Sequence, residues 1–290
     1  MLKFLKWFFC LFSKYVNSFE RRVDKFFTHI KSTDHLSDIR EDLLKLMQGN
    51  LIVLNVWLEK KFKGYTYLSK KVRRRMYENS DLIKSEFLKF YGEFSLDNES
   101  IRKDLNSKGL LYPNGDDEKI KYIACIQEFL SPGKYYEYIQ TSSFGKLLND
   151  PSKEKLQGDC NQIVTLYIYL YSLKYSISDL NIKLLPEHVC LHFRGIDIEA
   201  TNGTFAKHTE SRDVLPVTEI ISTNLLDLTD FREEVQEISP QMIVKSAQLA
   251  YAISSLKSFV AKNLDIAYHN LGVNALNENN FESAIFKKKK

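Results

Sequence analysis

Apolar residues recur at helical spacing through the first thirty residues of the chain, and basic residues stand between them. Such spacing places one side of a helix in an apolar environment. We therefore expect an amphipathic basic helix over residues 1–30, which packs on the rest of the protein, lies on an anionic membrane surface, or is a degenerate signal or anchor. The pattern is carried by Met1, Leu5, Phe8, Phe12, Phe19, Val23 and Phe26, with Lys3, Lys6, Lys14, Arg21 and Arg22 between them.

Residues 31–118 continue the helical pattern, with periodic Leu, Ile and Phe in DHLSDIREDLLKLM and NSDLIKSEFLKFYGEF. The apolar run at residues 51–58 fits a buried helix or a buried strand, because its periodicity does not distinguish the two. The turn cluster YPNGDDEK at residues 112–119 predicts the end of this helical region.

The pattern changes in residues 119–238, where short strand-like runs follow a long apolar helical run that starts at Cys160. The pair Arg194-Gly195 predicts a tight turn between two of these runs, which makes them an antiparallel hairpin. A helix followed by a small antiparallel sheet indicates the α+β fold class. The strands are expected over residues 182–185, 188–193 and 196–200.

The tail, residues 239–290, returns to a helical pattern. Its segment AYHNLGVNALNENNFESAIF resembles one partial tetratricopeptide repeat, with an LG pair, a small residue, a turn, an aromatic residue and an Ala in order. A single repeat cannot bury its own apolar face. We therefore expect it either to pack as a cap on the helix before it or to belong to a truncated repeat array, and to offer a surface to a protein partner.

The 290 residues carry 41 Lys and Arg against 37 Asp and Glu, a net charge of +4. The charge is uneven, because residues 1–75 hold 17 basic and 7 acidic side chains while the remainder has a net charge of −6. Residues 60–75 alone hold eight basic residues and no acid. This segment fits a solvated helix face or contact with anionic lipid. No nucleic-acid-binding motif accompanies it, so we expect no nucleic acid partner.

Four cysteines are too few for a disulfide framework, and none forms a C-x-x-C pair. This usage predicts a reducing compartment. We therefore expect a cytoplasmic protein. The alternative expectation is a cytoplasmic protein that associates with a membrane through its N-terminal helix. The cysteines are Cys10, Cys125, Cys160 and Cys190.

Cys160 is the cysteine whose position favours chemistry. It follows Gly158-Asp159 at the expected start of a helix, where unpaired backbone N–H groups and the helix dipole favour a thiolate. A thiolate nucleophile needs a base and a group that orients the base. His188 begins one expected strand and Glu199 lies on the next, so adjacent antiparallel strands bring the two within reach of each other.

This order of Cys, His and acid resembles the transglutaminase-like superfamily of papain-type cysteine enzymes, closest to its bacterial branch in which a small core precedes tetratricopeptide repeats. The matching words are SSFGKLLNDPSKEKLQGDCNQIVTLYIYLYSL, LPEHVCLHF and IDIEATNG. The resemblance implies that Cys160 is the nucleophile, His188 the base and Glu199 the orienting acid. It implies acyl transfer through a thioester, without metal or cofactor, on a peptide or protein substrate.

Three further residues are candidates for auxiliary roles. Gln157 is a candidate oxyanion donor beside the Cys160 backbone N–H. His192 lies on the same strand face as His188 and competes for the role of base. Asp197 shares the strand face of Glu199 and competes for the role of acid.

Two other interpretations stay open. His188, Cys190 and His192 alternate along one strand face and are possible zinc ligands, with Cys160 as a fourth. The core could instead be a non-catalytic scaffold whose helical tail binds a protein partner.

Overall fold

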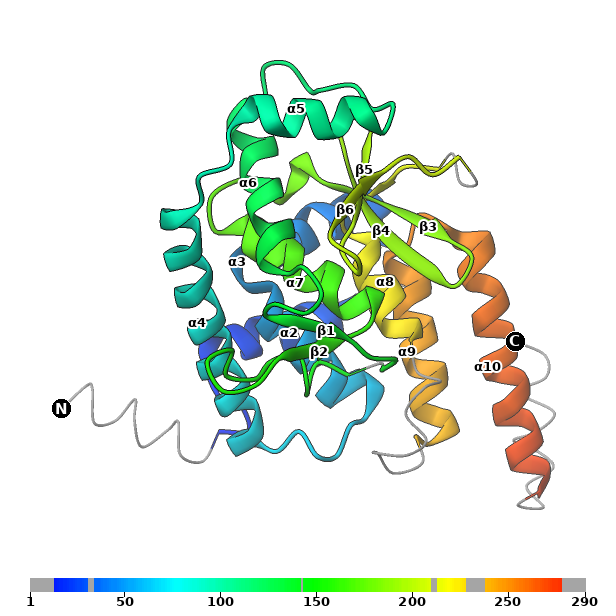
Figure 1. Ribbon diagram of the computed structural model, residues 1–290. Coiled ribbons are helices and arrows are strands. Elements are labelled where there is room, and N and C mark those ends of the chain that lie inside the picture. The colour runs from blue at the N-terminus through cyan, green and yellow to red at the C-terminus, as the bar shows by residue number, and fades with distance from the viewer. Residues whose placement is uncertain (1–12, 31–33, 142, 210–212, 228–237, 278–290) are drawn as a thin grey trace. The chain divides into compact units, whose positions relative to one another are not determined.

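The computed structural model describes residues 13–30, 34–141, 143–209, 213–227 and 238–277, and it confirms the α+β class (Figure 1). Helices dominate, and the larger of two sheets is a small antiparallel one. Among the described residues, no helix is both long enough and apolar enough to span a bilayer. The α-helices are α2 (Ser18–His29), α3 (Leu36–Leu58), α4 (Lys70–Glu93), α5 (Asn98–Ser107), α6 (Asp117–Phe129), α7 (Cys160–Ser172), α8 (Glu219–Leu226), α9 (Pro240–Ile253) and α10 (Lys257–Asn277), with a π-helical turn η1 (Glu59–Lys63) and a 3₁₀ turn η2 (Ile177–Asp179).

The chain forms two compact units, and each combines stretches that are distant in the sequence. The first unit comprises residues 1–46, 53–74 and 221–290, and the second comprises residues 47–52 and 75–220. Neither unit therefore has the bounds of a single segment expected from the sequence. Those segments are residues 1–30, 31–118, 119–238 and 239–290.

In the first unit, the described part of the N-terminal helix packs on the protein. Helix α2 begins at Ser18, because the extended Asn17 caps it by accepting hydrogen bonds from the backbone of Phe19 and Glu20, each at 3.0 Å. Val23 and Phe27 on this helix are buried. The expected continuation through residues 1–12 lies outside the described residues.

Helix α3 includes the apolar run at residues 51–58, so the choice left open by the sequence resolves to helix. The helix has a kink at Asn50, whose φ of −171° is extended rather than helical. All eight side chains from residue 51 to residue 58 are buried, and seven of the eight are apolar, which fits this full burial.

The C-terminal helices α9 and α10 pack against each other through a small apolar cluster. Ala247 and Ala267 stand at its centre, where small side chains allow the two helices to approach closely. Residues 254–256 separate the two helices, because α9 ends at Ile253 and α10 starts at Lys257. The second helix of the repeat-like segment lies outside the described residues.

The second unit is built around α7, which is buried over residues 162–171 and packs on strand β4. Its antiparallel sheet has the order β6-β5-β4-β3-β7, and a separate parallel pair, β1 with β2, leads into α7. The strands are β1 (Tyr136–Tyr138), β2 (Leu156–Gly158), β3 (Asn181–Leu185), β4 (His188–Phe193), β5 (Ile196–Glu199), β6 (Thr204–Ala206) and β7 (Leu215–Pro216).

The turn between β4 and β5 is the two-residue turn that the sequence predicts. Arg194 and Gly195 both have positive φ, at 50° and 87°, as a type I′ hairpin turn requires. The turn sets the register in which His192 pairs with Asp197 and Leu191 with Ile198. The isoleucines of β5 then share one face and its two acids share the other.

Candidate active site

The start of α7 holds Cys160 as its first helical residue. Asp159 caps the helix by accepting a hydrogen bond from the Asn161 backbone at 2.9 Å, and Gln162 accepts one in return from the Asp159 backbone at 3.2 Å. This reciprocal capping box fixes the first turn. Cys160 therefore lies at the end of the helix where backbone N–H groups and the helix dipole favour an anion.

The strand before the helix is held close to it. The Tyr136 hydroxyl donates to the carbonyl oxygen of Gly158 at 2.8 Å. A Cβ on Gly158 would lie 3.0 Å from the Cβ of Gln162, so a larger residue here would crowd the first turn of the helix. These contacts fix the position of Cys160 at the end of β2.

His188 and Glu199 meet across the hairpin. The Nε2 atom of His188 lies 2.7 Å from Oε2 of Glu199, and His188 is close enough to the Cys160 thiol for the thiol to influence its pKa. The interaction with Cys160 is the largest cause that raises the pKa of His188, and the hydrogen bond with Glu199 is the next; together they raise it to about 10, against the effect of burial. His188 therefore lies between Cys160 and a carboxylate, and both neighbours favour its protonated form.

Glu199 is buried, with both oxygens occupied. Its Oε1 atom forms a hydrogen bond with Nε2 of His208, a residue that the sequence analysis did not single out. Burial is the largest influence on the pKa of Glu199 and would raise it, but the hydrogen bonds with His188 and His208 outweigh burial and hold the pKa below its usual value. Glu199 is thus an ionised carboxylate shared by two imidazoles.

The cysteines of the described residues differ in exposure. Cys125 and Cys190 are buried, whereas Cys160 is half-buried. Burial raises the pKa of Cys125 to about 12, and burial followed by the charge of Glu199 raises that of Cys190 further. Cys160 is therefore the described thiol that a reagent or substrate can reach most easily.

His192 and Asp197 form a second, separate pair on the same hairpin. His192 Nδ1 lies 2.6 Å from Asp197 Oδ1, and its Nε2 accepts from the Gly195 backbone at 3.2 Å. Asp197 also accepts from the buried Lys183 at 2.9 Å. Burial would raise the pKa of Asp197, but the bonds with His192 and Lys183 lower it to about 2. Asp197 Oδ2 also accepts a hydrogen bond from the His208 backbone N–H at 2.7 Å, so Asp197 holds the segment that carries His208.

Gln157 does not point its amide at Cys160. Its Nε2 donates to the Glu137 carboxylate at 3.2 Å across the β1–β2 pair, where the two residues are register partners. The side-chain donor expected beside Cys160 is therefore engaged elsewhere.

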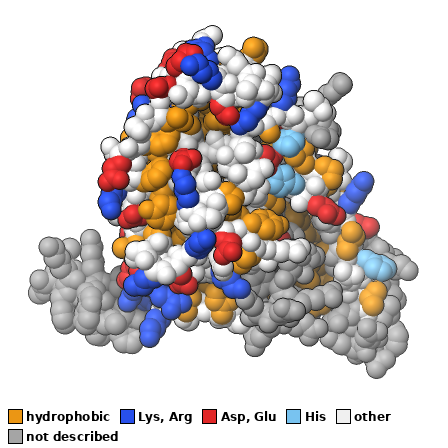
Figure 2. All heavy atoms as spheres, in the orientation of Figure 1, with side chains coloured by type: hydrophobic (Ala, Val, Ile, Leu, Met, Phe, Trp, Pro, Cys, Tyr) orange, Lys and Arg blue, Asp and Glu red, His pale blue; other side chains and the backbone are white. Residues whose placement is uncertain are grey.

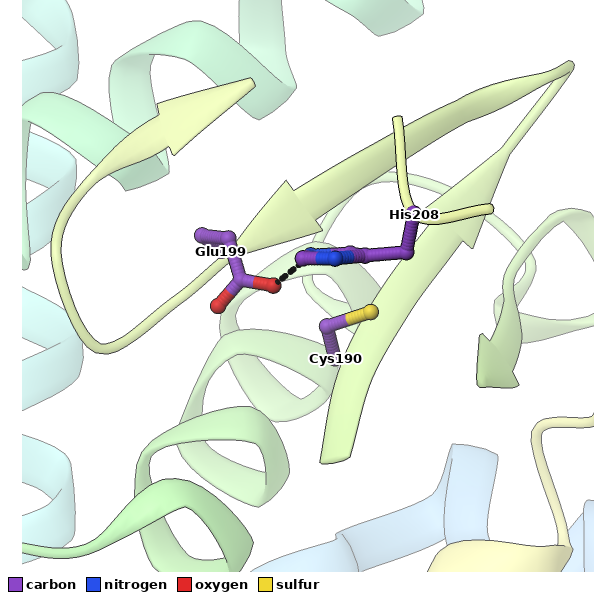
Figure 3. A group of neighbouring side chains, drawn as sticks. All are labelled: Cys190, Glu199 and His208. Carbon is purple, nitrogen blue, oxygen red and sulfur yellow. Dashed lines mark hydrogen bonds and ion pairs between the residues drawn. The ribbon is translucent and has the colours of Figure 1, made fainter. Parts of the chain in front are cut away.

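The zinc set His188, Cys190 and His192 does not converge. Alternate residues on a strand stand about 7 Å apart, too far for three of them to share one ion, and the two histidines bind different carboxylates. Within the described part of the chain, the group whose ligand atoms lie within 4.8 Å of one another is Cys190, Glu199 and His208 (Figure 3). His208 follows β6, which pairs with β5, and this pairing places it beside Glu199.

Both histidines of the Glu199 pair are accessible. The side chains of His188 and His208 are 27% and 24% exposed. Histidines reach the surface over the strands on the face drawn in Figure 2.

Comparison with protein-family models, with curated proteins and with solved structures finds no match to this chain.

Proposed function

We propose that this protein is a cysteine-nucleophile acyl-transfer enzyme with a transglutaminase-like core. The observation that carries the proposal is the continuous chain of contacts from Cys160 to His188 to Glu199. A half-buried thiol at a helix start, an imidazole and a buried carboxylate are the three parts of an activated nucleophile. The Ser-His-Asp/Glu and Cys-His-Asn triads of unrelated folds combine a nucleophile, a base and an orienting group in the same way.

In the proposed reaction, the Cys160 proton resides on His188, and the thiolate attacks the carbonyl carbon of a peptide or amide. The negative charge that develops on the carbonyl oxygen is stabilised by backbone N–H at the start of α7. His188 then gives its proton to the departing amine, and a thioester remains on Cys160. Water or a second amine then attacks the thioester and gives a proton to His188. The acyl product leaves by hydrolysis or transamidation, and Cys160 returns as a thiolate beside the reprotonated His188.

Glu199 supports this cycle without touching the substrate. Its carboxylate holds the His188 ring in one orientation and stabilises the positive charge that the ring carries beside a thiolate. The pKa of His188, raised to about 10, favours the protonated ring that donates to the departing amine in this cycle.

The test is the rate at which a small iodoacetamide probe labels Cys160, with the labelled cysteine identified by peptide mapping. We expect His188→Ala to slow the labelling about 100-fold or more, the usual size of a lost acid–base group. His192→Ala is the matched control, because it removes a histidine from the same strand that is paired with the other acid. Equal labelling of the His188→Ala variant and the unchanged protein would contradict the proposal and favour a non-catalytic scaffold.

A further inference from the structure

The Cys190 thiol has no part in the proposed reaction, although it lies beside the acid of the site. Cys190 is fully buried on β4, Glu199 is almost fully buried on β5, and His208 comes from the segment after β6. The three side chains converge from three neighbouring parts of the sheet (Figure 3). Their ligand atoms lie within 4.8 Å of one another.

Thiolate, carboxylate and imidazole are the three ligand types of protein zinc sites. Bond lengths of about 2.0–2.3 Å place tetrahedral ligand atoms roughly 3.3–3.8 Å apart, so the three atoms need to move by only about 1 Å. The ion would stand between Glu199 Oε1 and His208 Nε2, where a hydrogen now joins them. The partly exposed His208 provides a path for the ion from solvent.

We propose that Cys190, Glu199 and His208 form a zinc-binding site that inhibits the catalytic triad. On binding, the Cys190 thiol releases its proton to solvent, and a water completes the fourth position of the ion. This site differs from one built on alternate residues of β4, because its ligands come from separate strands and share one small volume.

The inhibitory effect rests on the proposed function, whereas the binding does not. A zinc ion on Oε1 draws the Glu199 carboxylate toward Cys190 and His208, and the Oε2 atom of the same carboxylate holds the His188 ring at 2.7 Å. The ion thus weakens the pair that keeps Cys160 reactive without contacting Cys160. Because one carboxylate serves both sites, zinc occupancy and full thiol reactivity oppose each other.

The binding is tested with Co²⁺ on the 290-residue chain with Cys160→Ser, in which the proposed nucleophile cannot supply sulfur. We expect one equivalent of Co²⁺ to produce a sulfur-to-cobalt charge-transfer band in the near ultraviolet, and Zn²⁺ to displace it. Adding Cys190→Ser should remove the band. Adding His208→Gln, at a more exposed position, should weaken binding by at least about tenfold. His192→Gln is the matched control and should leave the band unchanged. The absence of a band, or its survival without Cys190, would overturn the site.

The inhibition is tested on the protein that retains Cys160, as the ratio of iodoacetamide labelling rates with and without Zn²⁺ for each variant. We expect Zn²⁺ to slow labelling, and His208→Gln to remove that sensitivity while His192→Gln keeps it. Undiminished zinc sensitivity in His208→Gln would mean that zinc binds Cys160 and His188 directly, which contradicts the proposal. If Cys160 is unreactive without zinc, the proposed function fails, but the Co²⁺ experiment still decides the metal site.

Discussion

Glu199 uses one carboxylate oxygen for His188 and the other for His208, and this sharing makes it the central residue of the site. Asp197, two residues earlier on the same face, serves His192 and Lys183 in the same way. The hairpin thus carries two histidine–carboxylate pairs of similar geometry, and only the first lies beside Cys160. Removing one carboxylate at a time therefore separates the effect of the His188–Glu199 pair from that of the His192–Asp197 pair.

Glu199→Gln should slow the labelling of Cys160 by about 10- to 1,000-fold, because the neutral amide neither stabilises the imidazolium nor fixes its orientation. The double variant with His188→Ala should be within about twofold of His188→Ala alone, since residues that act as a unit have non-additive effects. Asp197→Asn is the control. It should leave labelling near the unchanged rate while lowering stability, because it leaves Lys183 buried without its carboxylate. An additive double variant would show that the two residues act independently.

At the scale of elements, the hairpin was predictable because its signals are local. The Arg194-Gly195 turn and the alternation of β4 and β5 are readable over a dozen residues, and the structure has both. Helix α7 was equally clear, because its apolar run follows a capping residue at Asp159. The contact between His188 and Glu199 follows from these local features alone.

Other features depend on contacts between residues far apart in the chain, and no local sequence pattern predicts them. His208 reaches Glu199 only because the three-residue strand β6 pairs with β5, and a strand this short has no pattern of its own. The kink at Asn50 interrupts a helix whose apolar residues continue on both sides. Gln157 looked free to serve Cys160 because the sequence does not reveal the β1–β2 pairing that gives it Glu137.

The turn after β5 offers a test of how closely elements approach. Gly203 has φ of 70°, and a Cβ there would lie 3.3 Å from Ser131 Oγ and 3.4 Å from Ser131 Cα. Gly109 has φ of 68° with nothing within 4 Å of such a Cβ. Gly109→Ala should cost about 1 kcal/mol of unfolding free energy for the backbone conformation alone. Gly203→Ala should cost at least about 1 kcal/mol more, because it also crowds its neighbour. Urea unfolding of the two variants measures this difference, and equal losses would show that the crowding relaxes without cost.

At the scale of the molecule, part of the basic N-terminal charge is used to bury acids within the first unit. Arg73 binds Glu20 at 2.7 Å, with side chains only 3% and 0% exposed. Asp24, which is 6% exposed, accepts hydrogen bonds from Lys61, from the Tyr15 hydroxyl at 2.5 Å and from Trp57 Nε1 at 3.2 Å. The contacts of Asp24 make the first unit sensitive to acid, because the protonated Asp24 carboxyl loses its ionic partners.

Burial would raise the pKa of Asp24, but the hydrogen bond from Lys61 and those from its other partners lower it from 3.8 to about 2. A pKa lowered in the folded state stabilises the protein above pH 3.8, and that contribution is lost as the pH falls toward 2. Its size is about 2 kcal/mol at neutral pH. Asp24→Asn should therefore remove about that much stability at pH 7 and flatten its decline between pH 4 and pH 2. Asp42→Asn, which disrupts an exposed pair with Lys45, should change stability by less than about 1 kcal/mol. Urea unfolding across this pH range measures both, and a parallel decline in Asp24→Asn and the unchanged protein would contradict the assignment.

The two-residue turn at Arg194-Gly195 also limits how this protein can change by insertion or deletion. Loops usually tolerate added residues. One residue added here would shift β5 by one position against β4 and turn Asp197 and Glu199 toward the core, with Ile198 on the opposite face. The number of residues in the turn thus decides which acid meets which histidine, and we expect its length to vary less than its side chains do.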